Sequence, residues 1–160
     1  MESSLKSSRL ILEPVGKDYG LQLLHTTYDK ALDWPAYSLR ALLPFYLERL
    51  AANENEKGYG PWIVRTRRLH HVIGTVGFKG RPNNLGEMDV GYHVISRYRQ
   101  QGYATEAVKS ICDWGLAQEQ VNSITAYCAV SNPSSHRVLL KNGFKKYKEE
   151  QDWILFRKES

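Results

Sequence analysis

The stretch RYRQQGYATEAVKSICDWG, residues 97–115, joins a glycine-bearing turn to a segment with the pattern of an amphipathic helix. Apolar residues recur at helical spacing from Ala104 to Gly115, so one face of this helix is expected to pack on a core. The first N–H groups of a helix lack partners within it, and the helix dipole makes that end partly positive. A phosphate group could accept several of these N–H groups, and the small residues Gly102 and Ala104 would let it approach.

The alternative for this turn is an ordinary connection between a strand and a helix. The stretch has neither the G-x-G-x-x-G pattern of a dinucleotide site nor the G-K-[ST] that ends a P-loop. The turn alone therefore leaves both interpretations open, and the surrounding sequence must decide.

The segments around the turn predict a mixed order of strands and helices. The strand patterns cover residues 7–15, 61–66, 70–80, 87–96, 122–130, 144–150 and 152–158. Helical patterns cover two segments within residues 18–53, separated by DWPAY, and also the segments after Gly102 and at 131–144. This order predicts one α/β domain over residues 1–160, with a mixed central sheet of six to seven strands and about four helices on both faces.

The chain is basic but has no concentrated basic surface. Its 160 residues carry a formal net charge of +5 with a pI near 9.2, which favours an anionic ligand. The basic residues are scattered along the chain, whereas a nucleic-acid-binding protein concentrates them on one face or arm. We therefore expect no nucleic-acid partner.

Nothing in the chain predicts a membrane span, a signal peptide or a metal site. No apolar run approaches the roughly 20 residues that cross a bilayer. The start MESSLKSSRLILEP has no basic region followed by an apolar one. Cys112 and Cys128 lie in apolar patterns without metal-ligand spacing. These observations predict a reduced, cytoplasmic protein without a metal, either a monomer or a homodimer.

The strand before the turn carries different side chains on its two faces. The apolar face consists of Met88, Val90, Tyr92 and Val94, which recur with a period of two. Asp89, Gly91 and His93 share the opposite face.

Four stretches in order resemble one enzyme superfamily. RQQGYA matches the R/Q-x-x-G-x-G/A pyrophosphate loop of the GNAT N-acetyltransferases. SSRLILEPV, VIGTVGFKG, DVGYHVISRYRQQGYATEAVKSICDWG and SNPSSHRVLLKNGF resemble the branch that includes the bacterial ribosomal-protein N-terminal acetyltransferases. The resemblance runs from about residue 8 to 147, and it implies a GNAT fold, acetyl-CoA as the donor and direct transfer to an amine.

The resemblance also assigns cofactor contacts. The end of the strand before the turn would pair with the pantetheine arm, and backbone N–H groups of the turn would hold the pyrophosphate. Asn132 would contact the cofactor arm, although it is also a preferred helix N-cap ahead of Pro133. The predicted cofactor-binding residues are Val94, Ile95, Arg99, Gln100, Gln101, Gly102, Tyr103, Ala104, Thr105 and Asn132.

Acetyl transfer needs a hydrogen-bond donor for the departing thiolate and a base for the amine proton. Many GNAT members place a tyrosine seven residues after the asparagine, but Leu139 stands there. The ribosomal-protein branch has a serine three residues after it, which implies Ser135 as the donor; the alternative is a helix serine bonded to its own backbone.

The family's acidic residue before I/V-G-Y corresponds to Asp89, which we predict as the base, directly or through a water. Glu87 and His93 share the strand face of Asp89 and are further candidates. His93 suits proton transfer because histidine titrates near neutral pH. The alternative for all three is an ordinary polar strand residue.

The expected acceptor is the N-terminal α-amine of a protein or peptide. A model α-amino group has a pKa of about 7.7–8.0 and a lysine about 10.4, so the α-amine loses its proton more easily. Alternatives are a small-molecule amine (an antibiotic, a polyamine or an amino acid) and a non-catalytic acyl-CoA-binding module. Residues 18–59 are expected to supply acceptor contacts, unless their aromatic side chains belong to the core; these are Trp34, Tyr37, Phe45 and Tyr46.

Overall fold

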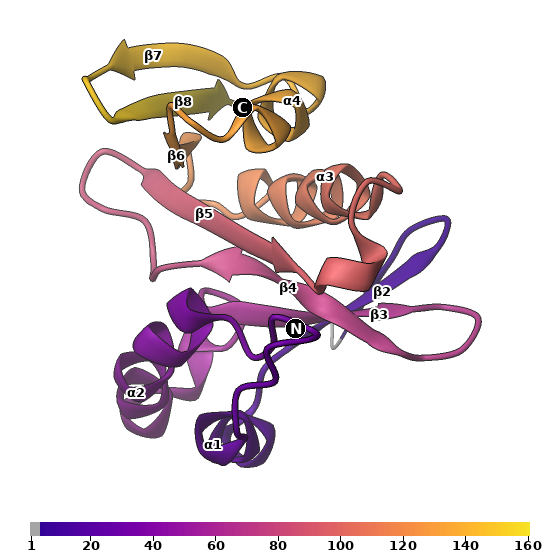
Figure 1. Ribbon diagram of the computed structural model, residues 1–160. Coiled ribbons are helices and arrows are strands. Elements are labelled where there is room, and N and C mark those ends of the chain that lie inside the picture. Colours follow the sequence, from indigo (N-terminus) through magenta and orange to yellow (C-terminus); the bar gives the residue numbers. More distant parts are fainter. Residues whose placement is uncertain (1–3) are drawn as a thin grey trace.

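A computed structural model describes residues 4–160, and its central feature is an eight-stranded mixed sheet (Figure 1). The strands lie in the order β1-β2-β3-β4-β5-β6-β8-β7, and every neighbouring pair is antiparallel except β5 and β6. The strands are β1 (Leu5–Lys6), β2 (Leu10–Pro14), β3 (Pro61–Thr66), β4 (Val72–Phe78), β5 (Glu87–Val94), β6 (Ser123–Ala129), β7 (Lys145–Glu149) and β8 (Trp153–Glu159). The α-helices are α1 (Lys17–His25), α2 (Tyr37–Ala52), α3 (Tyr103–Leu116) and α4 (Pro133–Lys141).

The predicted α/β class and order of elements are confirmed, with one addition. The short strand β1 pairs with β2 and raises the sheet to eight strands, where six to seven were predicted. Two residues are too few to show a period of two, so nothing in the sequence marks β1 as a strand.

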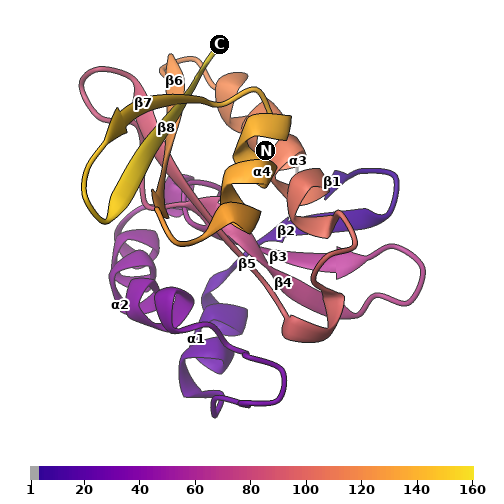
Figure 2. The ribbon, with the colours of Figure 1, turned by 45° about the horizontal axis from the view of Figure 1, so that its top comes forward.

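Helices cover both faces of the sheet (Figures 1 and 2). On one face α1 and α2 enclose a buried cluster that includes Val15, Leu43 and Ile63. On the other face α3 and α4 cover a larger cluster that includes Val108 and Ile124. Burial on both faces explains the nearly continuous apolar runs of β3 and β4.

β5 and β6 pair only where they begin. Their parallel register joins Glu87–Asp89 to Ser123–Thr125 and records no later pair, although β5 continues to Val94 and β6 to Ala129. The two strands therefore part beyond Asp89 and Thr125. We call the region between the parting strands the wedge.

The helix that follows β5 in the chain, α3, packs closely on the sheet because Gly115 has no side chain. A Cβ at this position would lie 2.7 Å from Cζ of Phe78 and 3.1 Å from Cε of Met88. The glycine thus sets the distance between α3 and the strands that form one wall of the wedge.

Gly115→Ala is expected to lower the free energy of unfolding by about 1–2 kcal/mol. Overpacking a core costs about 1–3 kcal/mol, and the better helix propensity of alanine offsets up to about 1 kcal/mol. Urea unfolding measures the difference, with Gly91→Ala as the control because a Cβ there meets nothing within 4 Å. Wild-type stability in Gly115→Ala would contradict the close packing.

Candidate active site

The backbone of β5 presents hydrogen-bonding groups to the wedge. The amide of Ile95 donates to the carbonyl of Ile73 (2.7 Å), and the carbonyl of Asp89 accepts from the amide of Lys79 (3.1 Å). Odd-numbered residues of β5 therefore bond to the β4 side. By the alternation of a ladder, the even-numbered residues from 90 to 94 turn their N–H and C=O groups towards the wedge.

This alternation separates the two residues predicted to pair with the pantetheine arm. Val94 directs its backbone into the wedge. Ile95 does not, because its N–H is bonded to Ile73 and its carbonyl accepts from the amide of Tyr98 at 2.9 Å. Its side chain is also buried in the core. The structure thus leaves Ile95 no backbone group for a ligand, and Tyr92 takes its place on the wedge edge.

The turn after β5 presents helix N–H groups without a side-chain cap. Gln100 and Gly102 have left-handed backbone, with φ values of 62° and 82°. Gly102 is the N-cap of α3 and makes no side-chain cap, and the amide of Glu106 is bonded to its carbonyl at 3.1 Å. The amides of Tyr103, Ala104 and Thr105 precede that first helical bond. Small side chains and open N–H groups at a helix start fit a pyrophosphate.

Arg9, at the edge of β2, clamps this turn and was not anticipated from the sequence. Its Nε donates to Glu106 Oε1 at 2.7 Å and its Nη1 donates to the carbonyl of Gln101 at 2.9 Å. Its guanidinium lies 4.2 Å from the ring centre of Tyr103. Burial alone would raise the pKa of Glu106, but hydrogen bonds from Ser7 and Arg9 outweigh it and lower that pKa. The ionised carboxylate therefore anchors Arg9 beside the turn.

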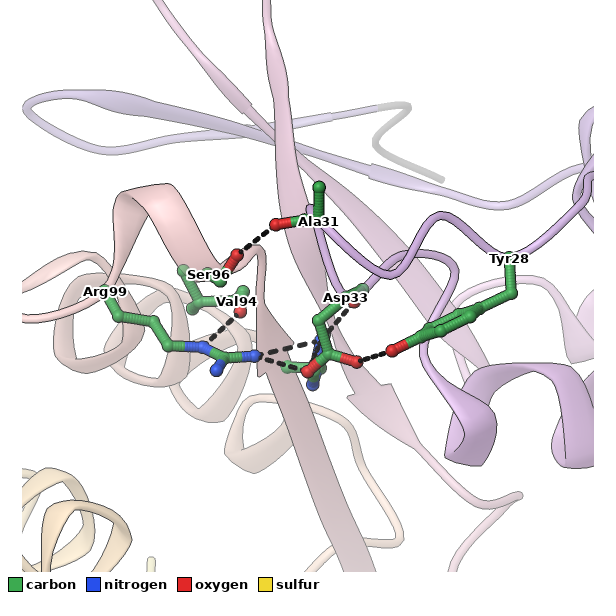
Figure 3. Close-up of polar contacts among 7 residues, drawn as sticks. Tyr28, Ala31, Asp33, Val94, Ser96 and Arg99 are labelled. Carbon is green, nitrogen blue, oxygen red and sulfur yellow. Dashed lines mark hydrogen bonds and ion pairs between the residues drawn. The ribbon is translucent and has the colours of Figure 1, made fainter.

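Arg99 points away from the predicted phosphate position. Its Nε donates to the carbonyl of Val94 at 2.8 Å, and its Nη2 donates to Asp33 Oδ2 at 2.7 Å (Figure 3). Asp33 lies in the loop between α1 and α2, and its pKa is lowered by the Arg99 hydrogen bond and then by that from Tyr28. The side chain of Arg99 thus ties the turn to this loop, and the charge predicted for the pyrophosphate is engaged elsewhere.

A second tie joins the same loop to the turn. Ser96 donates through its hydroxyl to the carbonyl of Ala31 at 2.9 Å (Figure 3). Its amide also donates to the carbonyl of Leu32 at 3.1 Å. The loop between α1 and α2 is therefore fixed against the end of β5.

The start of α4 lies across the wedge from β5. Asn132 Oδ1 accepts the amide of Ser135 at 3.2 Å, so this asparagine does cap the helix, as its alternative interpretation proposed. The hydroxyl of Ser135 lies 2.5 Å from the phenol oxygen of Tyr92. Burial raises the pKa of Tyr92 to about 12, so its phenol is neutral. Leu139, at the usual tyrosine position, is buried in the core.

The three base candidates are spread along the opposite face of β5, and each has different hydrogen-bonding partners. Asp89 is held by Lys79 Nζ at 2.8 Å and by the hydroxyl of Thr125 at 3.1 Å. Glu87, at the start of the strand, accepts from Asn83 Nδ2 at 3.1 Å.

Among the described residues, the hydrogen-bond partners of the His93 ring all lie at one of its two nitrogens, Nε2. Its Nε2 lies 2.8 Å from the carbonyl of Asp33. A carbonyl only accepts, so Nε2 carries the proton of the neutral ring and Nδ1 keeps its lone pair.

An apolar groove of about 430 Å³ lies between α2 and strands β3–β5 on this face. Phe45 and Leu42 line it from α2, and Gly91 and Lys79 line it from the sheet side. Among the aromatic residues expected to contact an acceptor, Phe45 lines the groove and is 65% exposed. Tyr46 instead is fully buried and bonded to the carbonyl of Val15.

The remaining two aromatic residues in that expectation lie apart from the groove lining. Tyr37 is 85% exposed at the start of α2. Trp34 packs against the cluster under α1 and α2.

Comparison with known proteins identifies the architecture. The family profile described as acetyltransferase (GNAT) domain matches residues 9–145. The chain belongs to this GNAT acetyltransferase family. It is 29% identical over 147 residues to the uncharacterized N-acetyltransferase YjdG of Bacillus subtilis (strain 168), a match that covers 90% of this chain and 88% of that protein.

Solved GNAT structures have the same fold. Ribosomal-protein-S5-alanine acetyltransferase from Vibrio fischeri superposes with a TM-score of 0.74 at 20% identity, covering 99% of this chain and 97% of that one. Spermidine N-acetyltransferase from Vibrio cholerae, in complex with CoA and spermine, gives 0.72 at 16% identity, covering 96% of each chain.

Family membership makes the chain an N-acetyltransferase that uses acetyl-CoA. Among residues 4–160, no group of three or more His, Cys, Asp or Glu side chains is arranged to hold a metal ion. No helix in the described part of the chain has both the length and the apolar character needed to cross a membrane.

The charge of a side chain at Gly102 tests the pyrophosphate position. Gly102→Ala and Gly102→Glu share the strain of a left-handed residue, so their difference reports charge and size rather than φ. We expect Gly102→Glu to bind acetyl-CoA at least about tenfold more weakly than Gly102→Ala, because a carboxylate would repel phosphates. Titration calorimetry gives both affinities. Equal affinities for acetyl-CoA in the two folded variants would show that the pyrophosphate does not bind at this turn.

Proposed function

We propose that this GNAT enzyme acetylates the α-amine of a peptide or protein. The observation that carries the proposal is the apolar groove, whose lining within residues 4–160 includes one lysine and no acidic side chain. When bound, acetyl-CoA supplies a thioester: a bond from the acceptor nitrogen to the acetyl carbon forms while the carbon–sulfur bond breaks and the thiolate leaves with the bonding pair.

The groove suits a peptide end better than a polyamine. A polyamine carries several positive charges and calls for carboxylates along its length, but no acidic side chain lines the groove. The nearby carboxylate of Asp89 is paired with Lys79, which itself lines the groove. The apolar walls suit the side chain of a first residue, and Lys79 disfavours a second cation.

The sheet beyond the groove offers room for the following residues of a peptide. Tyr127 on β6 shares the face of Thr125, which bonds Asp89, and is 56% exposed. Its ring lies 5.3 Å from that of Trp153 and 5.8 Å from Lys79 Nζ. An aromatic pair beside the groove supports an acceptor longer than the groove itself.

The contacts of the base candidates favour His93. Both carboxylate oxygens of Asp89 are engaged, one by Lys79 and one by Thr125. His93 retains Nδ1, its Nε2 is held by Asp33, and its side chain is 21% exposed. It follows Gly91 by two residues on the same strand face, so it flanks the groove. We propose that His93 takes the amine proton and that Asp89 orients Lys79.

A mixed library of peptides with free α-amines and internal lysines, incubated with acetyl-CoA, tests the acceptor. Mass spectrometry is expected to find acetyl groups on the α-amines, because roughly a tenth of these are uncharged near neutral pH and far fewer lysines are. A parallel arm offers spermidine and free amino acids, read by release of CoA. If only lysine side chains or only the small amines are acetylated, the proposed α-amine acceptor is wrong.

Two substitutions separate the candidate bases. His93→Gln should lower kcat by about 100-fold, in the range typical of general-base loss. Asp89→Asn should cost less than about tenfold. Calorimetry with acetyl-CoA serves as the control, since neither side chain lies on the cofactor side of β5. A larger loss in Asp89→Asn would return the role of base to Asp89.

A further inference from the structure

The side chain of Tyr92 reaches from β5 to α4 across the wedge. Its phenol oxygen lies 2.5 Å from Ser135 Oγ and 3.3 Å from the carbonyl of Ser135. The two residues are 43 positions apart in the sequence, on the two elements that flank the wedge. The ring packs against the core cluster that includes Val90 and Leu139.

The chemistry of the two hydroxyls sets the direction of their hydrogen bond. The distance between the two hydroxyls is compatible with either one donating, and the phenol can also donate to the carbonyl of Ser135. A phenol is the stronger acid of the two, so in the inferred arrangement Tyr92 donates to Ser135 Oγ. Ser135 then keeps its own proton for a third group. Asn132 already fixes the backbone of Ser135 by accepting its amide. The residue is thus held at the backbone by one partner and at the side chain by another.

We propose that Tyr92 is a positioning residue for acetyl transfer: its phenol holds the Ser135 hydroxyl so that the serine proton points into the wedge, towards the sulfur that leaves. The proposal rests on the proposed function, because it needs acetyl transfer to an amine at this site, and it takes Ser135 as the donor to the thiolate, the role that the family resemblance implies for it. It goes beyond it by giving a role to a strand residue whose apolar neighbours serve only the core.

Packing alone does not account for the tyrosine. The ring occupies the core face of β5, where Met88 and Val90 are wholly apolar, and a phenylalanine would fill the same space. The hydroxyl adds a part-buried polar atom, and removing such an atom from water costs free energy unless it is hydrogen-bonded. Its partner is the one serine that the family resemblance and the position at the start of α4 place beside the wedge.

Two donors in series stabilise a negative charge more than one does. Each hydrogen bond in a chain polarises the next, so a phenol behind the serine strengthens the O–H that faces the sulfur. The pKa of Tyr92, raised by burial to about 12, lies above the roughly 8.5 of an ordinary thiol. The phenol therefore keeps its proton and acts as a neutral donor, and the thiolate receives its final proton from solvent.

A double-mutant cycle on turnover tests the link between the two hydroxyls. Tyr92→Phe keeps the ring and should lower kcat by roughly tenfold, and Ser135→Ala by roughly 10–100-fold, the range for losing a donor to a developing charge. Because Tyr92 acts through Ser135, the double variant should be no slower than Ser135→Ala alone. Multiplied losses would show that the two residues act independently, and wild-type kcat in Tyr92→Phe would remove Tyr92 from the site.

A second readout needs no acceptor and no turnover. If the hydroxyl pair favours the thiolate, binding of free CoA at mildly alkaline pH should release protons, measured by calorimetry in two buffers of different ionisation enthalpy. Tyr92→Phe and Ser135→Ala should reduce this release, while the affinity for desulfo-CoA, which has no thiol, stays at the wild-type value.

The acetylation assay and the proton-release measurement test the acceptor and the role of Tyr92 separately. If no amine is acetylated but proton release still depends on both hydroxyls, the acceptor assignment is wrong and the pair stands. If proton release is the same in wild type and Tyr92→Phe, the positioning role is wrong whatever the acceptor. A weaker affinity of Tyr92→Phe for desulfo-CoA would show that the hydroxyl only supports the shape of the wedge.

Discussion

The early end of the β5–β6 ladder is the constraint on which the rest of the site depends. Backbone groups inside a sheet are normally paired with the next strand, but this ladder stops at Asp89 and Thr125 while both strands continue. The sheet stays intact because β4 holds β5 on one side and β8 holds β6 along its whole length on the other. The open backbone edge therefore lies in the middle of the molecule, between two firmly paired halves, and a ligand that completes it is enclosed from both sides.

Two charged contacts from distant segments give the turn after β5 its shape. Arg9, in the turn between β1 and β2, reaches it through Glu106 and the carbonyl of Gln101. Asp33 reaches it from the α1–α2 loop through Arg99. An arginine suits both places because its planar fork donates in several directions at once. Since Arg99 also bonds the carbonyl of Val94, one side chain joins the α1–α2 loop to the backbone at the end of β5.

Local patterns predicted the elements of this fold well, because helix starts, caps and strand alternation depend on residues a few positions apart. Asn132 and Gly102 are examples, and each lies where its local signal indicates. The contacts that complete the candidate site could not be predicted from such local patterns, because they join residues far apart in the sequence. Glu106 and Arg9 are 97 residues apart, and periodicity placed Tyr92 correctly among apolar residues while saying nothing of its hydroxyl. The direction of Arg99 was missed for the same reason, since it depends on how the α1–α2 loop folds back onto β5.

Alternation along β5 shows how one strand could serve both halves of the proposed acyl transfer. Consecutive side chains of a strand face opposite sides of the sheet, so the open position of Gly91 faces the groove while the side chain of Tyr92 extends to α4. A Cβ at Gly91 would point into open space, so the proposed acceptor would meet no side chain there. The proposed donors to the sulfur, Tyr92 and Ser135, lie on the other side of the sheet. In this proposal a single peptide unit separates the path of the amine from the donors for the thiolate, at the place where the β5–β6 ladder has ended.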